Sequence, residues 1–246
     1  MIVSSHQKGW KIITQRSHGL LAAMIAYQYN IDLPVEIIVP ALIAIAEHDD
    51  GVSETLAHQN LTAAGAPRNF TVADGNIKTN ITPMLSLMEI ANSKSQLNGL
   101  LASLHIKFLY DSDKRKTDLR LDNFLKDQEE YRTNALKNLN ISNKFANHLY
   151  RLLEWTDAFS LLICQDKIQA KERKMEISIS PDGDMNTVHY KLNKDICVEP
   201  WPFKIESFNV FYEFKILGQL QFESIENFND VYKIAKNHHE VFVFSK

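Results

Sequence analysis

Histidine and aspartate residues interrupt several otherwise apolar segments of this 246-residue chain. His18 begins one such segment, His48 and Asp49 end the next in AIAEHDDG, and Asp157 lies within LLEWTDAFSLLIC. A buried polar side chain is costly unless it has a partner, so each of these residues needs one. Neutral imidazoles and carboxylates suit divalent zinc, manganese, iron or nickel. We therefore predict that His18, His48, Asp49 and Asp157 together bind a divalent metal ion.

Other polar residues could extend this site to a second metal ion or to a substrate. His105, in LLASLHIKFLY, could bind a second metal, contact substrate or transfer a proton, or it could be a histidine of the core. Asp50 could orient or deprotonate a metal-bound water, or it could be a solvated carboxylate. His58 and Gln15 are candidates for a substrate contact or a second metal, the alternatives being a loop histidine and a structural hydrogen bond.

A structural explanation of the four predicted ligands is also open. His18 could occupy the first turn of a helix, the aspartates after His48 could form a solvated helix end, and Asp157 could bond to nearby backbone. Carboxylates at a helix C-terminus oppose the helix dipole, however. Glu47, Asp49 and Asp50 together therefore need a compensating cation, which favours the metal.

Apolar residues recur at helical spacing over the first two thirds of the chain. Ser17 is the predicted N-cap of the first helix, Gly51 stops the second, and Pro40 should kink that helix or mark its true start. Residues 52–80 form a long irregular segment, which in a compact domain is usually functional and here could cover the site. The periodicity predicts helices over residues 17–31, 34–51, 82–93, 97–112, 119–139 and 143–166.

The pattern changes near Lys171 to the alternation typical of strands. We predict a mainly α protein, with a helical bundle over residues 1–170 and an antiparallel β-rich part over residues 171–246 packed on it. The expected strands are 174–180, 186–192, 208–217, 219–225 and 240–246.

Composition excludes several classes of protein. The chain is 45% hydrophobic and 23% charged with a net charge of −3, so it has no basic field for nucleic acid. Its two cysteines form no CxxC pattern, which excludes a disulfide framework or a cysteine zinc site and indicates a reducing compartment. The sequence has no signal peptide and no apolar run that could span a bilayer. We expect a cytoplasmic protein that binds neither nucleic acid nor membranes.

The order His, then His-Asp, then a distant Asp, all on helices, resembles the HD-domain superfamily of metal-dependent phosphohydrolases. More closely, ITQRSHGLLAA, AIAEHDDG, LLASLH, LLEWTDAFSLLIC and EPWPF resemble an uncharacterised bacterial family, domain of unknown function 3891, over nearly the whole chain. The resemblance implies an HD-like helical fold with appended strands, and it is consistent with His18, His48, Asp49 and Asp157 as metal ligands. It implies no known reaction.

The expected function is hydrolysis of a small-molecule phosphate ester, such as one derived from a nucleotide, by a metal-activated water. No Gly-rich phosphate loop and no evident Lys/Arg clamp accompanies the predicted site. Two alternatives stay open. One is an HD-like di-iron oxygenase, which needs both His58 and His105 to point inward. The other is a non-catalytic metal-binding or ligand-sensing protein, in which the strand over residues 208–217 supplies an edge for a homo-oligomer.

Overall fold

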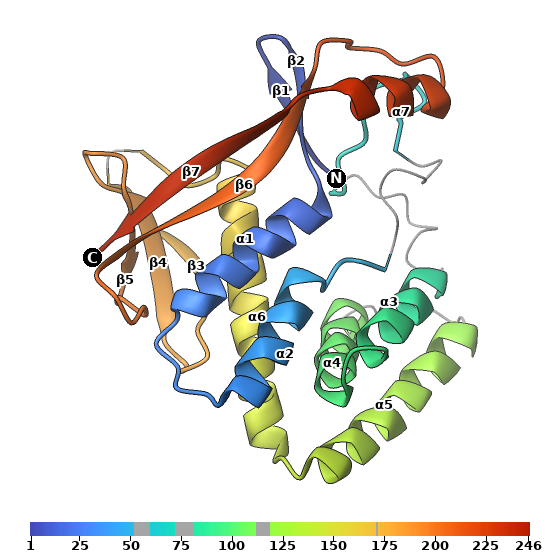
Figure 1. The fold of residues 1–246 in the computed structure, drawn as a ribbon, viewed down its shortest axis with the longest axis vertical. Coiled ribbons are helices and arrows are strands. Elements are labelled where there is room, and N and C mark those ends of the chain that lie inside the picture. Colours follow the sequence, from blue (N-terminus) through green and yellow to red (C-terminus); the bar gives the residue numbers. More distant parts are fainter. Residues whose placement is uncertain (52–59, 72–80, 112–118, 171) are drawn as a thin grey trace.

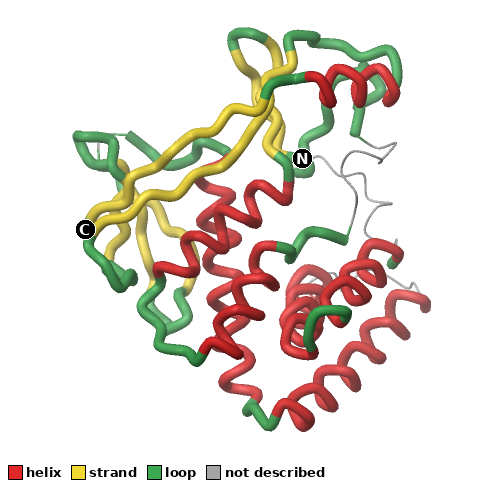
Figure 2. Tube along the Cα trace, viewed as in Figure 1, coloured by secondary structure: helices red, strands yellow, loops and turns green. Residues whose placement is uncertain are grey.

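A seven-stranded sheet and a group of helices make up the protein (Figures 1 and 2). The computed structural model describes residues 1–51, 60–71, 81–111, 119–170 and 172–246. Figure 2 shows the strands curling along one side and most helices gathered on the other. The fold class is therefore mixed α/β, and the prediction of a mainly α bundle is wrong.

The sheet takes strands from both ends of the chain. Its spatial order is β1-β2-β6-β7-β5-β4-β3, and every pairing is antiparallel except that between β5 and β7. The strands are β1 (Ile2–His6), β2 (Gly9–Ile13), β3 (Met175–Ile179), β4 (Met185–Tyr190), β5 (Ile196–Glu199), β6 (Ser207–Leu217) and β7 (Asn237–Ser245).

The N-terminal hairpin is the reason that the fold-class prediction failed. In β2, Trp10 pairs with Leu217 and Ile12 pairs with Lys215, so the hairpin is hydrogen-bonded to β6 some two hundred residues later. A five-residue strand carries little periodic signal, and nothing local identifies so distant a partner. The division at residue 170 stays a prediction, although the sheet draws strands from both sides of it.

The six predicted helices are present, and a seventh follows them. Residues 219–225 do not form the predicted strand but lead into α7, so that prediction is wrong. No helix in the described part of the chain is long and apolar enough to cross a membrane. The helices are α1 (Gln15–Gln28), α2 (Val35–Ala46), α3 (Thr82–Asn92), α4 (Gln96–Asp111), α5 (Leu119–Leu139), α6 (Asn143–Cys164) and α7 (Ile225–Ile234).

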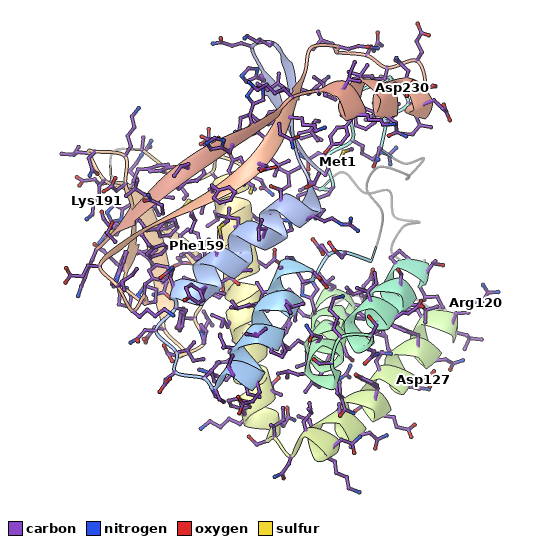
Figure 3. All side chains as sticks on the ribbon, in the orientation of Figure 1. Met1, Arg120, Asp127, Phe159, Lys191 and Asp230 are labelled. Atoms are coloured by element: carbon purple, nitrogen blue, oxygen red, sulfur yellow. The ribbon has the colours of Figure 1, made fainter. Side chains whose placement is uncertain are left out.

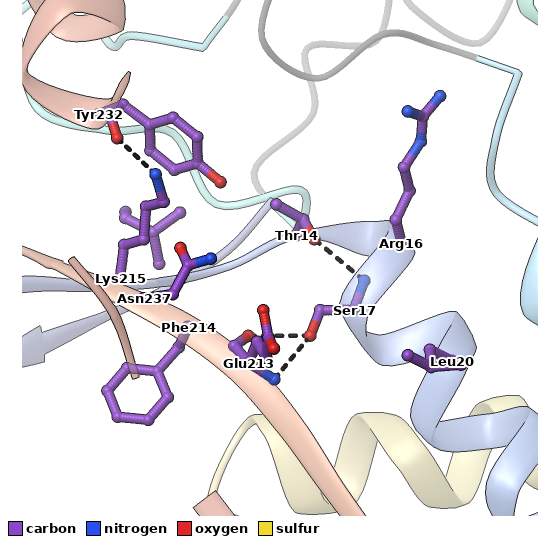
Figure 4. A pocket seen from close by; sticks show the side chains of 10 residues that line it. Thr14, Arg16, Ser17, Leu20, Glu213, Phe214, Lys215, Tyr232 and Asn237 are labelled. Carbon is purple, nitrogen blue, oxygen red and sulfur yellow. Dashed lines mark hydrogen bonds between the residues drawn. The ribbon is translucent and has the colours of Figure 1, made fainter. Parts of the chain in front are cut away.

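The start of α1 is attached to the sheet. Thr14, not Ser17 as predicted, caps the helix, since its Oγ1 accepts a hydrogen bond from the backbone N–H of Ser17. The Ser17 hydroxyl instead donates to the carbonyl of Glu213 at 2.8 Å and accepts from the N–H of Glu213 at 2.9 Å (Figure 4). These bonds join α1 to β6, which pairs with β2 over Lys215–Leu217 and with β7 over Ser207–Lys215. The homo-oligomer edge expected on this strand stays a prediction.

The end of α2 packs tightly on α1. Pro40 lies inside α2, and the helix ends at Ala46 rather than continuing to Gly51. A Cβ atom on Gly19 would lie 2.3 Å from the carbonyl oxygen of Ala46. Only a glycine at this position lets α1 approach the last turn of α2 so closely.

The main core lies between the sheet and helices α1, α2, α4 and α6. Trp155 of α6 contacts Phe159, which is labelled in Figure 3, in an edge-to-face arrangement at 5.4 Å, and Phe159 contacts Phe244 of β7. Phe203, from the EPWPF stretch, contacts Trp155 and Phe244 in the same cluster. The aromatic side chains therefore join the central helix to the middle of the sheet.

A polar network links strands β2, β6 and β7 of the sheet. Lys11 of β2 donates to the Tyr212 hydroxyl and to Glu240 Oε2, both at 2.7 Å, and Tyr212 donates to Glu240 at 2.6 Å. Partial burial raises the pKa of Glu240, but the hydrogen bonds from Lys11 and Tyr212 outweigh it and lower the pKa below its usual value.

We expect Glu240→Gln to destabilise the protein at pH 7 but not at strongly acidic pH. A carboxyl whose pKa is lowered by folding contributes stability above its unfolded-state pKa of about 4.3, and this contribution is lost as the pH falls through the folded pKa. The effect should be about 1 kcal/mol or less, because 45% of the Glu240 side chain is exposed. Urea unfolding at pH 7 and pH 3 measures it, with the exposed Glu206→Gln as control.

We expect Gly19→Ala to lower the free energy of unfolding by about 1–3 kcal/mol, because the added methyl group overlaps the Ala46 carbonyl. Alanine is otherwise favoured over glycine in a helix by about 1 kcal/mol, so a stabilised variant would contradict the packing described here. Gly218→Ala is the control, since its Cβ would lie 3.6 Å from the carbonyl oxygen of Lys8, an ordinary contact. Urea unfolding of both variants gives the comparison.

Candidate metal centre

Two helices and one turn bring the four predicted ligands together. His18 lies on α1, Asp157 on α6, and His48 and Asp49 in the turn after α2. Oδ1 of Asp157 lies 3.2 Å from Nε2 of His18 and 3.2 Å from Nε2 of His48. Because α2 ends at Ala46, His48 and Asp49 are oriented by a turn and not by the helix end that the sequence predicted.

The Asp49 carboxylate lies between these imidazoles and His105 of α4. Its Oδ2 is 3.6 Å from His48 Nε2 and 4.0 Å from His18 Nε2, whereas its Oδ1 is 3.9 Å from His105 Nε2. Gln15 Nε2 donates to Oδ2 at 2.7 Å, which holds the carboxylate in place. The structure thus brings His105 and Gln15 to the same group as the four predicted ligands.

The three histidines are buried and the two carboxylates are partly open to solvent. His18, His48 and His105 are at most 2% exposed, whereas the side chains of Asp49 and Asp157 are 30% and 19% exposed. Water can therefore reach the group from the carboxylate side, while the imidazoles are fixed within the core.

The His48 ring is oriented by its backbone contact. Nδ1 lies 2.7 Å from the carbonyl oxygen of Ile45, and a carbonyl can only accept, so Nδ1 carries the proton. In the neutral ring the lone pair on Nε2 then faces the carboxylate oxygens. Nε2 is buried and has no hydrogen-bond partner of normal geometry among the described residues. A cation at this point, either a proton or a metal ion, would relieve the repulsion between these atoms.

The electrostatic balance of the group follows from the two aspartates. Burial lowers the pKa of His48, but the charges of Asp49 and Asp157 outweigh it and raise the pKa to about 10. Burial would raise the pKa of Asp157, but His48 and His18 hold it well below its usual range. Asp157 is therefore ionised at neutral pH, and the group attracts positive charge.

His105 differs from His48 in its charge state. Burial, together with the nearby His48, lowers its pKa to about 4, so the ring is neutral at physiological pH. Its ring stacks on Phe108 at 6.5 Å, and the Tyr150 hydroxyl lies 3.4 Å from its Nδ1. A neutral imidazole is able to bind a metal ion or to accept a proton.

Two overlapping sets of residues within this group could hold a metal ion. One comprises His18, His48 and Asp157, and the other His48, Asp49 and His105, with the ligand atoms of each set within 4.8 Å of one another. Imidazole nitrogens and carboxylate oxygens are suitable donors for a first-row divalent ion. Three or four such donors leave coordination positions open for water.

Asp50 points to a different partner. Its Oδ1 lies 3.3 Å from Nε of Arg16, and Glu47 likewise pairs with Lys94 at 2.8 Å. Two of the three carboxylates that follow α2 are thus paired with basic side chains, and only Asp49 joins the histidines. For Glu47 and Asp50 the compensating positive charge that the sequence calls for is therefore a basic side chain, Lys94 and Arg16 respectively.

Arg16 is the residue beside the site that the sequence reasoning missed. It precedes His18 by two residues in ITQRSH, which is the signal that could have identified it. Its side chain is 60% exposed and extends away from the contacts between Ser17 and Glu213 (Figure 4). It lines a pocket of about 390 Å³ between α1, β6 and α7 that also contains Lys215 and Tyr232.

His58 lies outside the described residues, so its predicted role stays a prediction. Of the predicted irregular segment, residues 60–71 pack near β1 and α7. The N–H of Phe70 donates to the Met1 carbonyl, and the N–H of Phe222 donates to the Gly65 carbonyl. Residues 52–59 and 72–80 lie outside the described residues, and the expectation that the segment covers the site stays a prediction.

Comparison with known proteins gives one result. No curated protein and no solved structure matched the chain. Nothing in these comparisons supports the resemblance to HD-domain phosphohydrolases. The model of one family, described as a protein of unknown function (DUF3891), matches residues 1–219. Because this match covers most of the 246 residues, the chain belongs to the DUF3891 family.

Proposed function

We propose that this protein is a metal-dependent hydrolase, of the type seen in HD-domain enzymes, that acts on a phosphate ester. The observation that carries the proposal is the convergence of His18, His48 and Asp157 within 3.2 Å contacts, with Asp49 beside them. Ionised Asp157 lies beside the Nε2 atoms of two buried imidazoles, with the Asp49 carboxylate next to them, and this arrangement suits a divalent cation that would displace the proton from His48.

Each residue has a role that follows from its position. His18, His48, Asp157 and Asp49 would hold the ion, which when bound makes water nucleophilic near neutral pH and neutralises phosphate oxygens. Gln15 orients Asp49 by its hydrogen bond. The neutral His105 is placed to accept a proton from water near Asp49, or to return it to the leaving group.

Arg16 supports a phosphate ester as the substrate. It is an exposed guanidinium paired with Asp50, the residue that follows the candidate ligand Asp49, and guanidinium binds phosphate oxygens through paired hydrogen bonds. Its present partner, Asp50, would have to release it. In this proposal Asp50 holds Arg16 in place until the substrate binds. This role replaces the expectation that Asp50 deprotonates a metal-bound water.

A second candidate rests on the position of Asp49. Its two oxygens face different imidazoles, Oδ2 towards His18 and His48 and Oδ1 towards His105, so it could bridge two ions. Two bridged irons would support the HD-like oxygenase. A metal-binding protein without catalysis is the third candidate, and the experiments below separate all three.

We expect the protein purified without added metal to hold about one divalent ion per chain at this centre, so that Asp157→Asn or Asp49→Ala contains about one ion per chain less than wild type. Removal of a carboxylate removes both a ligand and the charge that attracts the cation. Elemental analysis of the variants and of wild type gives the metal content. Asp50→Asn is the matched control, because this neighbouring carboxylate faces Arg16 and should retain the ion.

Equal metal content in wild type and Asp157→Asn, or no binding after reloading with zinc, manganese, iron and nickel, would contradict the metal centre. About two irons per chain would favour the oxygenase.

We expect the metal-loaded protein to hydrolyse p-nitrophenyl phosphate esters, with kcat/KM reduced about a hundredfold or more in Asp157→Asn. Arg16→Gln should lower kcat/KM about tenfold to a hundredfold, since a charge-assisted hydrogen bond contributes about 1.5–3 kcal/mol. The kcat/KM of Arg16→Lys should lie between those of wild type and Arg16→Gln. Release of nitrophenolate measures the rates. A metal-loaded protein that hydrolyses neither monoesters nor diesters would favour the non-catalytic alternative.

A further inference from the structure

A second group of potential metal ligands lies on strands β4 and β5, and it shares no residue with the candidate metal centre. His189 of β4 and Cys197 and Glu199 of β5 each offer one ligand atom, and these atoms all lie within 4.8 Å of one another. The group combines a thiol, an imidazole and a carboxylate, which is a donor set typical of zinc.

The strand register places these side chains on one face of the sheet. His189 lies directly opposite Cys197, and Glu199 follows Cys197 by two residues. Val188 and Val198, which alternate with them, are fully buried in the main core. Because successive side chains in a strand point to opposite faces, His189, Cys197 and Glu199 point away from that core.

Burial distinguishes this group from an ordinary surface cluster. His189 and Cys197 are each 6% exposed, although they face away from the main core. Nδ1 of His189 is buried and has no hydrogen-bond partner among the described residues. A buried imidazole nitrogen without a partner is unfavourable, and a metal ion in the group would order the ring and its neighbours.

We propose that His189, Cys197 and Glu199 form a zinc site on the outer face of β4 and β5. Tetrahedral zinc has Zn–S and Zn–N distances of about 2.3 and 2.0 Å, so the ligand atoms need only a small approach. Three protein ligands leave the fourth position to water. The site binds zinc and not a harder cation such as magnesium, because it includes a thiol and an imidazole.

Zinc binding to this group releases a proton and breaks an ion pair. Burial raises the pKa of the Cys197 thiol, so the thiol is protonated in the free protein and releases its proton to solvent when the zinc–sulfur bond forms. Glu199 forms an ion pair with Lys174, the residue that precedes β3. The zinc ion replaces Lys174 as the partner of Glu199, and Lys174, which is 54% exposed, moves into solvent.

Cobalt(II) titration of the chelator-treated full chain tests this proposal, because a bound thiolate gives a near-ultraviolet charge-transfer band that histidine and carboxylate ligands do not. We expect the band in wild type and its loss in Cys197→Ser. Cys164→Ser is the matched control and should retain the band, since Cys164 is also buried but belongs to no candidate ligand group in the described part of the chain. Asp157→Asn should retain it too, which separates this site from the candidate metal centre.

Lys174→Gln provides a second readout that does not depend on removing a ligand. Loss of the competing ammonium should tighten zinc and cobalt binding about two- to fivefold, as expected for release of a largely exposed ion pair. Absence of the band in wild type would overturn the proposal. Retention of the band in Cys197→Ser, or its loss in Cys164→Ser, would do so as well.

Discussion

The contact of one partly exposed carboxylate with two buried imidazoles is the interaction around which the helices are arranged. Asp157 lies on α6, which packs against α1, α2, α4 and β3 and therefore occupies the middle of the molecule. His18 and His48 reach Asp157 from α1 and from the end of α2. A negative charge at this depth is stable only with positive charge beside it. The positions of α1, α6 and the end of α2 therefore depend on the charge of Asp157.

The sheet contributes to this arrangement and is not an appendage. β2 pairs with β6, and α1 begins only two residues after β2 ends. The Ser17 hydroxyl then ties the first turn of α1 to the backbone of β6, one residue before His18. On the other side of α1, Gly19 allows the close approach to α2. The direction in which His18 points therefore depends on contacts with a strand that lies near the other end of the chain.

The proposed zinc site on β4 and β5 arises in a different way. It depends on cross-strand register and not on helix packing, since His189 faces Cys197 directly across an antiparallel pair. The two cysteines lie in no short motif, and the absence of such a motif was the reason to exclude a cysteine zinc site from the sequence. Strand pairing can bring together ligands from positions that no linear pattern relates.

Much of the candidate site could be predicted from the sequence. His18, His48, Asp49 and Asp157 could be selected because each is a polar residue within or beside a strongly apolar helical segment, and burial of such a residue demands a partner. The helices could also be located, because their periodicity extends over many residues. The hairpin over residues 2–13, the strand β5 and helix α7 could not, since each is short and takes its conformation from what it packs against.

By itself, then, the sequence determined that helices α1 to α6 form and that His18, His48, Asp49 and Asp157 need polar partners, because hydrophobic periodicity and the polarity of a side chain can be read along the chain. Only the tertiary structure decided that the protein is mixed α/β, that Asp50 faces Arg16 while Asp49 faces the histidines, and that His189 lies opposite Cys197. These features depend on strand pairing and on side-chain direction after a turn, which are set by contacts between residues far apart in the chain.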